Sequence, residues 1–133
     1  MSKIAIIDDD PDIVEALSFL LTAKGYDVVA AVNVDDALSL VESSRPDVII
    51  LDVMMVEPDD GFYLANKFRK LGIEAPIIML TSVAKVTGYE FAKSERLPVQ
   101  EFLEKPISAE KLLEYVSKYA PIVKLTNSEG AKC

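Results

Sequence analysis

The sequence contains no histidine. This absence excludes a Ser-His-Asp triad, a zinc site with histidine ligands and a phosphohistidine relay within this chain. The one cysteine, Cys133, has no partner for an internal disulfide, which is typical of a thiol in a reducing cytosol. No apolar run reaches the ~18 residues of a membrane span, and no signal-peptide pattern opens the chain. We therefore expect a cytoplasmic location and no contact with a membrane.

Basic residues are scarce: 14 lysines and arginines stand against 22 acidic residues, which leaves a net charge of −8. A surface this acidic repels phosphate backbones, so direct nucleic-acid binding is not expected. Half of the 133 residues are hydrophobic, which is typical of one compact domain with a sizeable core. We expect residues 1–120 to form this domain and residues 121–133 to form a short, flexible extension.

Short apolar runs alternate with segments of helical spacing. Four of the runs are nearly continuous in Ile, Val and Leu, which is typical of parallel strands buried on both faces. The expected strands are residues 4–7, 28–32, 48–51 and 77–80, with a weaker one at 99–103. This alternation predicts an α/β protein with a doubly wound parallel sheet and helices on both faces.

Four helices are predicted from apolar positions that recur every three or four residues. Gly25 and Gly72 are expected to end the first and third helices, and Asn33 and Ser108 to begin the second and last. The apolar positions are Ile13, Leu17, Leu20 and Leu21; Val34, Leu38 and Val41; Leu64, Phe68 and Leu71; and Leu112, Val116 and Tyr119. A further helix between residues 83 and 95 has weak periodicity and is interrupted by Gly88.

Polar residues follow four of the apolar runs. They are Asp8 and Asp9, Asp52, Thr81 and Lys105. Each has an ordinary explanation when taken alone; the three aspartates before Pro11, for example, suit the start of a helix. In an open parallel sheet, however, ligands bind at the carboxyl ends of the strands, and all five side chains are expected at this edge.

Three neighbouring carboxylates repel one another, so such a cluster either binds a hard divalent cation or takes up protons. Oxygen ligands with room for water favour Mg²⁺. A carboxylate held beside a cation, a hydroxyl and a lysine is suited to attack phosphorus and to become an acyl phosphate.

Four segments together resemble the response-regulator receiver domain of two-component signalling, of the chemotaxis-regulator type. They are residues 6–11 (IIDDDP), 46–52 (PDVIILD), 78–82 (IMLTS) and 102–106 (FLEKP). The resemblance extends from Lys3 to Tyr119. It implies a flavodoxin-like three-layer sandwich whose five-stranded parallel sheet has the order 2-1-3-4-5.

The resemblance also implies a role for each site residue. Asp52 is the phosphoacceptor and a metal ligand. Asp9 binds Mg²⁺ directly, Asp8 binds it through water, and the backbone carbonyl of Met54 is a further ligand. Thr81 and Lys105 bind the phosphoryl oxygens, and Phe102 is the aromatic switch residue coupled to Thr81.

The implied partners are a sensor histidine kinase or a histidine phosphotransfer protein as phosphodonor, and a downstream effector protein or a domain missing from this chain. Such a domain catalyses its own phosphorylation and dephosphorylation. It is nevertheless a signalling switch rather than a turnover enzyme.

Two regions depart from the family pattern. The loop between Asp52 and Gly61 is one residue longer than usual, and Val56 stands where a proline is normal. Leu97 and Pro98 replace the usual Gly-Ala pair before the last strand. We therefore expect a reshaped loop beside the acceptor and an irregular fourth helix.

Three other classes of protein share part of this pattern. A flavodoxin-like cofactor domain needs a phosphate-binding loop after its first strand, where residues 8–10 are all acidic. A haloacid-dehalogenase-type phosphatase needs a second aspartate where Met54 stands. A degenerate receiver that acts as a phosphorylation-independent interaction module is the alternative that stays open.

Overall fold

The computed structural model describes residues 2–52, 60–82, 100–105 and 107–120. Within these ranges it contains five strands: β1 (Lys3–Ile7), β2 (Asp27–Ala31), β3 (Val48–Asp52), β4 (Ile77–Ser82) and β5 (Glu101–Lys105). It also contains four helices: α1 (Pro11–Ala23), α2 (Val34–Ser44), α3 (Asp60–Lys70) and α5 (Ala109–Tyr119). The expected helix between residues 83 and 95 and the expected extension 121–133 lie outside the described residues, as do Met54, Val56, Leu97 and Pro98.

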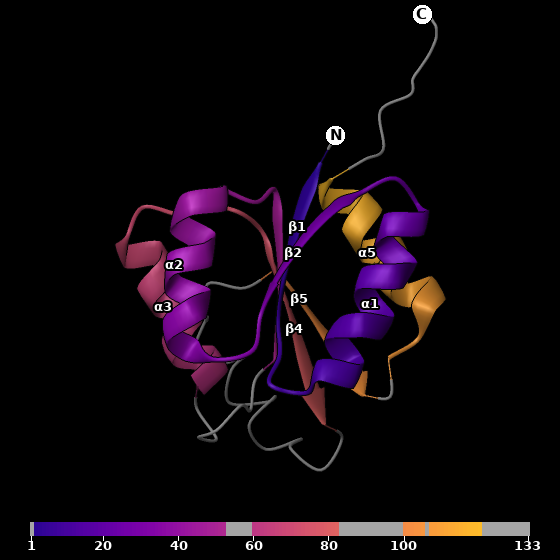
Figure 1. Cartoon of the computed structure of the whole chain (residues 1–133), viewed down its shortest axis with the longest axis horizontal. Coiled ribbons are helices and arrows are strands. Elements are labelled where there is room, and N and C mark those ends of the chain that lie inside the picture. The colour runs from indigo at the N-terminus through magenta and orange to yellow at the C-terminus, as the bar shows by residue number, and fades with distance from the viewer. Residues whose placement is uncertain (1, 53–59, 83–99, 106, 121–133) are drawn as a thin grey trace, which may run out of the picture.

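The strands form one sheet of order β2-β1-β3-β4-β5, and every neighbouring pair is parallel. Helices α2 and α3 cover one face of this sheet, and α1 and α5 cover the other (Figure 1). The predicted doubly wound three-layer fold and its strand order are therefore confirmed.

The core has two halves, one on each face of the sheet. Successive residues of a strand point to opposite faces, so Ala5 and Ile7 pack under α2 and α3, whereas Ile4 and Ile6 pack under α1 and α5. All four are completely buried. This explains why the apolar runs are continuous rather than alternating.

The predicted helix starts are confirmed by hydrogen bonds from the first turn. The Asp36 amide donates to Asn33 Oδ1 at 2.8 Å, and the Lys111 amide donates to Ser108 Oγ at 3.2 Å. Gly25 and Gly72 both have positive φ: Gly25 directly follows the C-cap of α1, and Gly72 lies in the turn after α3, where its amide donates to the Arg69 carbonyl at 3.0 Å. These contacts satisfy backbone groups that a helix end leaves unpaired.

The last strand differs from its predicted position. It was expected at residues 99–103, but β5 covers Glu101–Lys105. The Gln100 amide donates to the Ile77 carbonyl at 2.9 Å, and Gln100 Oε1 accepts from the Ile77 amide at 2.7 Å, so Gln100 aligns the start of β5 with β4. Pairing with the neighbouring strand, rather than local hydrophobicity, sets these bounds.

Tyr26 joins the end of α5 to the start of β2. Its side chain is buried, and its hydroxyl donates to the Ala120 carbonyl at 2.8 Å. Burial raises the pKa of the Tyr26 hydroxyl above its usual value, because the charged phenolate loses its hydration. No helix among the described residues has the length and apolar character needed to cross a bilayer.

We expect Tyr26→Phe to lower the free energy of unfolding at pH 7 by about 1 kcal/mol, since it leaves the buried Ala120 carbonyl without this donor. The raised pKa means that the unfolded chain ionises first, so wild-type stability is lost as pH rises above about 10. Phenylalanine does not ionise, so the Tyr26→Phe variant does not lose stability in this way. The difference in free energy of unfolding between the variant and the wild type should therefore shrink above about pH 10. Chemical denaturation at both pH values measures this.

Tyr63→Phe is the matched control, because Tyr63 is 52% exposed. It should leave the stability at pH 7 unchanged. Equal effects of the two substitutions would show that the hydrogen bond of Tyr26 contributes nothing.

Candidate functional site

Three carboxylates meet at the carboxyl edge of the sheet. Asp8 and Asp9 directly follow β1, and Asp52 is the last residue of β3. Since β1 and β3 are paired neighbours, their ends are adjacent. Each of the three side chains offers an oxygen, and these oxygens lie within 4.8 Å of one another. The structure thus brings together the three aspartates that were predicted to form one site.

The three carboxylates differ in burial. Asp8 is completely buried, Asp52 is 4% exposed, and Asp9 is exposed. A buried carboxylate is costly unless hydrogen bonds or opposite charge compensate it. Asp8 Oδ1 accepts from the Asp10 amide at 2.9 Å, which provides part of this compensation. The site therefore has two enclosed carboxylates and one open to solvent.

Backbone contacts hold Asp8 in place from two sides. Its amide donates to the Ala31 carbonyl at the end of β2, at 3.2 Å. Asp10, whose amide binds the Asp8 side chain, is also the N-cap of α1 and accepts from the Asp12 amide at 3.0 Å. The sequence indicates a helix start at the three aspartates before Pro11, but it carries no signal for the contacts of Asp8 with Ala31 and the Asp10 amide, since these depend on backbone geometry.

Thr81 and Lys105 are placed by the backbone of β4 and β5. Leu80 aligns with Asp52 across the β3–β4 pair, and Thr81 is the next residue of β4. Lys105 aligns with Ser82 across the β4–β5 pair. Both residues therefore lie at the same edge of the sheet as the acidic cluster, as predicted.

Phe102 and Met54 complete the set of predicted residues. Phe102 aligns with Met79 in the β4–β5 pair, and its half-buried ring packs against the core under α2 and α3. Met54 lies outside the described residues. The switch role of Phe102 and the metal-ligand role of the Met54 carbonyl stay predictions.

The acidic cluster fits a small divalent cation. Oxygen ligands about 2.1 Å from Mg²⁺ lie roughly 3 to 4 Å apart in an octahedron, and a bridging water extends this distance. Carboxylate oxygens within 4.8 Å of one another match this spacing. Three oxygen donors without nitrogen or sulfur favour a hard cation such as Mg²⁺ over metals that prefer nitrogen or sulfur ligands. Asp8, Asp9 and Asp52 are the residues that could hold it.

A doubly wound parallel sheet with polar side chains at its carboxyl edge defines a class of α/β domains that bind ligands at this edge. The sequence profile of the response regulator receiver domain matches residues 4–117. The chain therefore belongs to the family of response-regulator receiver domains, the domains of two-component signalling.

Solved structures show the same relationship. A candidate response regulator of Chloroflexus aurantiacus is 30% identical with a TM-score of 0.74, and the match covers 89% of this chain and 96% of that one. A receiver-domain protein of Clostridium thermocellum is 26% identical with a TM-score of 0.80, covering 90% and 94%. NtrX of Brucella abortus is 26% identical with a TM-score of 0.78; the match covers 89% of this chain but only 26% of NtrX.

We expect free Mg²⁺ to raise the melting temperature, because a bound cation relieves the repulsion among the three carboxylates. At a concentration ten times the dissociation constant, the free energy of unfolding should rise by about 1.4 kcal/mol. Asp9→Ala should abolish this dependence. Thermal unfolding monitored over a Mg²⁺ titration measures both.

Asp35→Ala is the control, since Asp35 is an exposed carboxylate in the first turn of α2, outside the cluster. Its melting temperature should respond to Mg²⁺ as that of the wild type does. A wild-type protein indifferent to tens of millimolar Mg²⁺, on the order of ten weak dissociation constants, would mean that the cluster is not a metal site.

Proposed function

We propose that this chain is a phosphoacceptor switch, in which Asp52 takes a phosphoryl group from a histidine kinase or a histidine phosphotransfer protein in a Mg²⁺-dependent reaction. The observation that supports this most is the position of Asp52. It is 4% exposed, ends β3, and has an oxygen within 4.8 Å of both other carboxylates. The side chain of Asp52 is thus enclosed by the protein but still reaches solvent.

The position of β3 in the sheet favours Asp52 over the other two carboxylates as the acceptor. β3 lies between β1, which is followed by Asp8 and Asp9, and β4, which ends with Thr81 and Ser82. Asp52 therefore has acidic residues on one side and the hydroxyl-bearing strand end on the other. Asp8 already accepts the Asp10 amide, and Asp9 faces solvent.

The proposed reaction moves one phosphoryl group. A carboxylate oxygen of Asp52 attacks phosphorus, an aspartyl phosphate forms, and the bond from phosphorus to the partner's histidine nitrogen breaks. The leaving imidazole keeps the electron pair of that bond. Mg²⁺, when bound, would neutralise charge on the phosphoryl oxygens. We assign Thr81 and Lys105 to the remaining phosphoryl oxygens on the basis of the family resemblance and their place at the same edge.

As a switch, the protein would transmit the state of Asp52 to an effector through Thr81 and Phe102. The effector is a separate protein or a domain missing from this chain. The chemistry of this protein would be its own phosphorylation and dephosphorylation rather than turnover of a substrate, and its proposed location is the cytoplasm.

We expect incubation with acetyl phosphate and Mg²⁺ to add the mass of one phosphoryl group to the wild type. Asp52→Asn should abolish this addition, because an amide is a poor nucleophile. Intact-mass spectrometry measures both. Asp35→Asn, which changes an exposed carboxylate on α2, should be labelled like the wild type.

Two outcomes would contradict the proposal in different ways. Labelling of the Asp52→Asn variant would mean that another residue is the acceptor. A wild type that binds Mg²⁺ but is labelled by neither acetyl phosphate nor a phosphorylated histidine phosphotransfer protein would favour the phosphorylation-independent interaction module instead.

A further inference from the structure

β2 is an edge strand of the sheet. Among the described residues it pairs only with β1. The Asp27 amide donates to the Ser2 carbonyl at 2.9 Å, and the Ala31 carbonyl accepts from Asp8 at 3.2 Å. Alternate residues of a parallel strand direct their amide and carbonyl to opposite sides. Val28 and Ala30 therefore present these groups at the outer edge.

Among the residues that the structure describes, this edge has no lysine, proline or bulge that would prevent pairing with another chain. Edge strands are commonly protected by lysine, proline or a bulge. After Asp27, β2 consists only of Val28, Val29, Ala30 and Ala31, and its register with β1 is uninterrupted. Ala30 is exposed, and Val32, directly after the strand, is 44% exposed.

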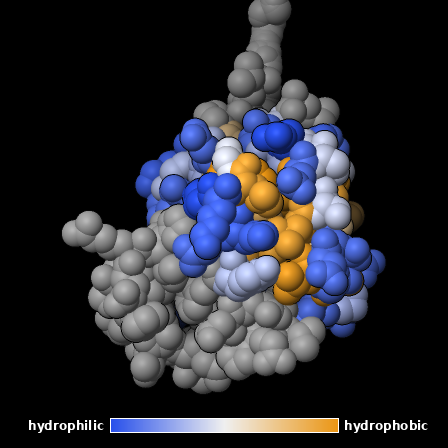
Figure 2. Space-filling view, turned by 90° about the vertical axis from the view of Figure 1, so that its left-hand side faces the viewer, coloured by the Kyte–Doolittle hydropathy of each residue, from blue (hydrophilic) through white to orange (hydrophobic). Residues whose placement is uncertain are grey.

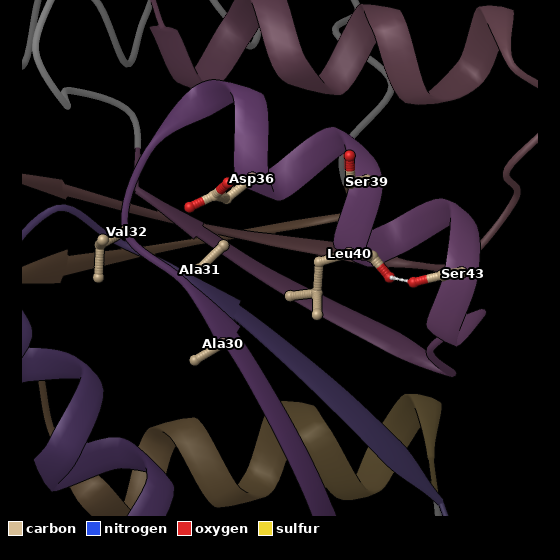
Figure 3. A pocket seen from close by; sticks show the side chains of 7 residues that line it. All are labelled: Ala30, Ala31, Val32, Asp36, Ser39, Leu40 and Ser43. Atoms are coloured by element: carbon tan, nitrogen blue, oxygen red, sulfur yellow. Dashed lines mark hydrogen bonds between the residues drawn. The ribbon is translucent and has the colours of Figure 1, made fainter.

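A groove of about 410 Å³ lies beside this edge, between β2 and α2. Ala30, Ala31 and Val32 line it from the strand side, and Asp36, Ser39, Leu40 and Ser43 line it from α2 (Figure 3). In Figure 3, Asp36 lies near the Val32 end of the groove and Ser43 lies at the other end. Figure 2, which shows the side of the molecule covered by α2 and α3, has an apolar strip bordered by hydrophilic residues.

Helices α1 and α2 and strand β2 carry only acidic charges, whereas the neighbouring strand β1 contributes Lys3, whose Nζ donates to the Ser44 carbonyl at 3.3 Å. Neither α1, β2 nor α2 contains a lysine or arginine; Lys24 and Arg45 are the C-caps that follow the two helices. The acidic residues of these three elements are Asp12, Glu15, Asp27, Asp35, Asp36 and Glu42. The charged residue in the lining of the groove is Asp36, so an occupant of the groove meets a negative charge there.

We propose that the β2 edge binds an extended segment of a partner protein, in which apolar residues alternate with lysine or arginine, as an added strand. Outward backbone groups of Val28 and Ala30 would pair with the segment, the groove would take its apolar side chains, and Asp36 would attract its cations. A second copy of this chain fits less well, because both copies carry a net charge of −8. This proposal is independent of the acceptor role of Asp52.

The test uses the full chain and a blocked hexapeptide of alternating lysine and valine as the probe. Two-dimensional NMR should show saturable shifts of the Val28 and Ala30 amides. A peptide of alternating glutamate and valine should produce none. Raised salt should weaken binding, since the attraction is between exposed charges.

Two substitutions separate backbone pairing from charge. Ala30→Pro removes an outward amide and leaves the bonds to β1 intact, so peptide affinity should fall about fivefold or more. Ala30→Thr, which keeps the amide, is its control. Asp36→Asn keeps an oxygen for the Asn33 side chain but removes the charge, so affinity should fall and its salt dependence should weaken. Thermal unfolding confirms that each variant is folded.

Several results would overturn the proposal. One is equal binding of the acidic and basic peptides, and another is a set of shifts confined to a different surface. A third is dimerisation of the free chain in sedimentation that is lost in Ala30→Pro, which would identify a second copy as the occupant. If Ala30→Pro does not fold, the shift map of the wild type and the Asp36→Asn titration still decide.

Discussion

The burial of carboxylates at the ends of β1 and β3 is the constraint on which the rest of the site depends. Asp8 is completely buried and Asp52 nearly so. Asp8 follows β1 and Asp52 is the last residue of β3, and both strands are buried on both faces, so each aspartate stands where the core ends and the carboxyl edge begins. Burying a carboxylate costs free energy unless hydrogen bonds or a cation compensate its charge. The backbone donors around these carboxylates and any bound cation are therefore part of the site.

Polar contacts of a different kind lie at the opposite edge of the sheet, where the strands begin. Tyr26 binds the end of α5, the Lys3 amide donates to Asp47 Oδ2 at 2.8 Å, and Arg69 Nη1 donates to the Ile73 and Ala75 carbonyls at 2.8 and 2.9 Å. These side chains satisfy backbone groups between elements and therefore stabilise the frame. The edge where the strands begin thus carries hydrogen bonds that stabilise the fold. The carboxyl edge brings together three carboxylates, whose like charges suit the binding of a cation.

Strand β2 supports the acidic cluster on its inner side and forms the open edge on its outer side. The inner side of β2 positions Asp8 through the Ala31 carbonyl, while its outer side presents Val28 and Ala30. A segment added to the outer side would lie one strand away from the carboxylates. The two surfaces are therefore distinct in chemistry, since one is a cluster of carboxylates and the other a backbone edge, but they are built on neighbouring strands.

The sequence by itself determined the strands, the helix starts and the identity of the aspartates at the carboxyl edge, because continuous Ile, Val and Leu runs and capping residues act locally. It did not determine the bounds of β5, which depend on the pairing of Gln100 with Ile77. Nor did it show that Asp8 is buried while its neighbour Asp9 is exposed, or that β2 borders a groove with α2. Only the tertiary structure decided these, because burial, register and open edges are set by which elements pack together.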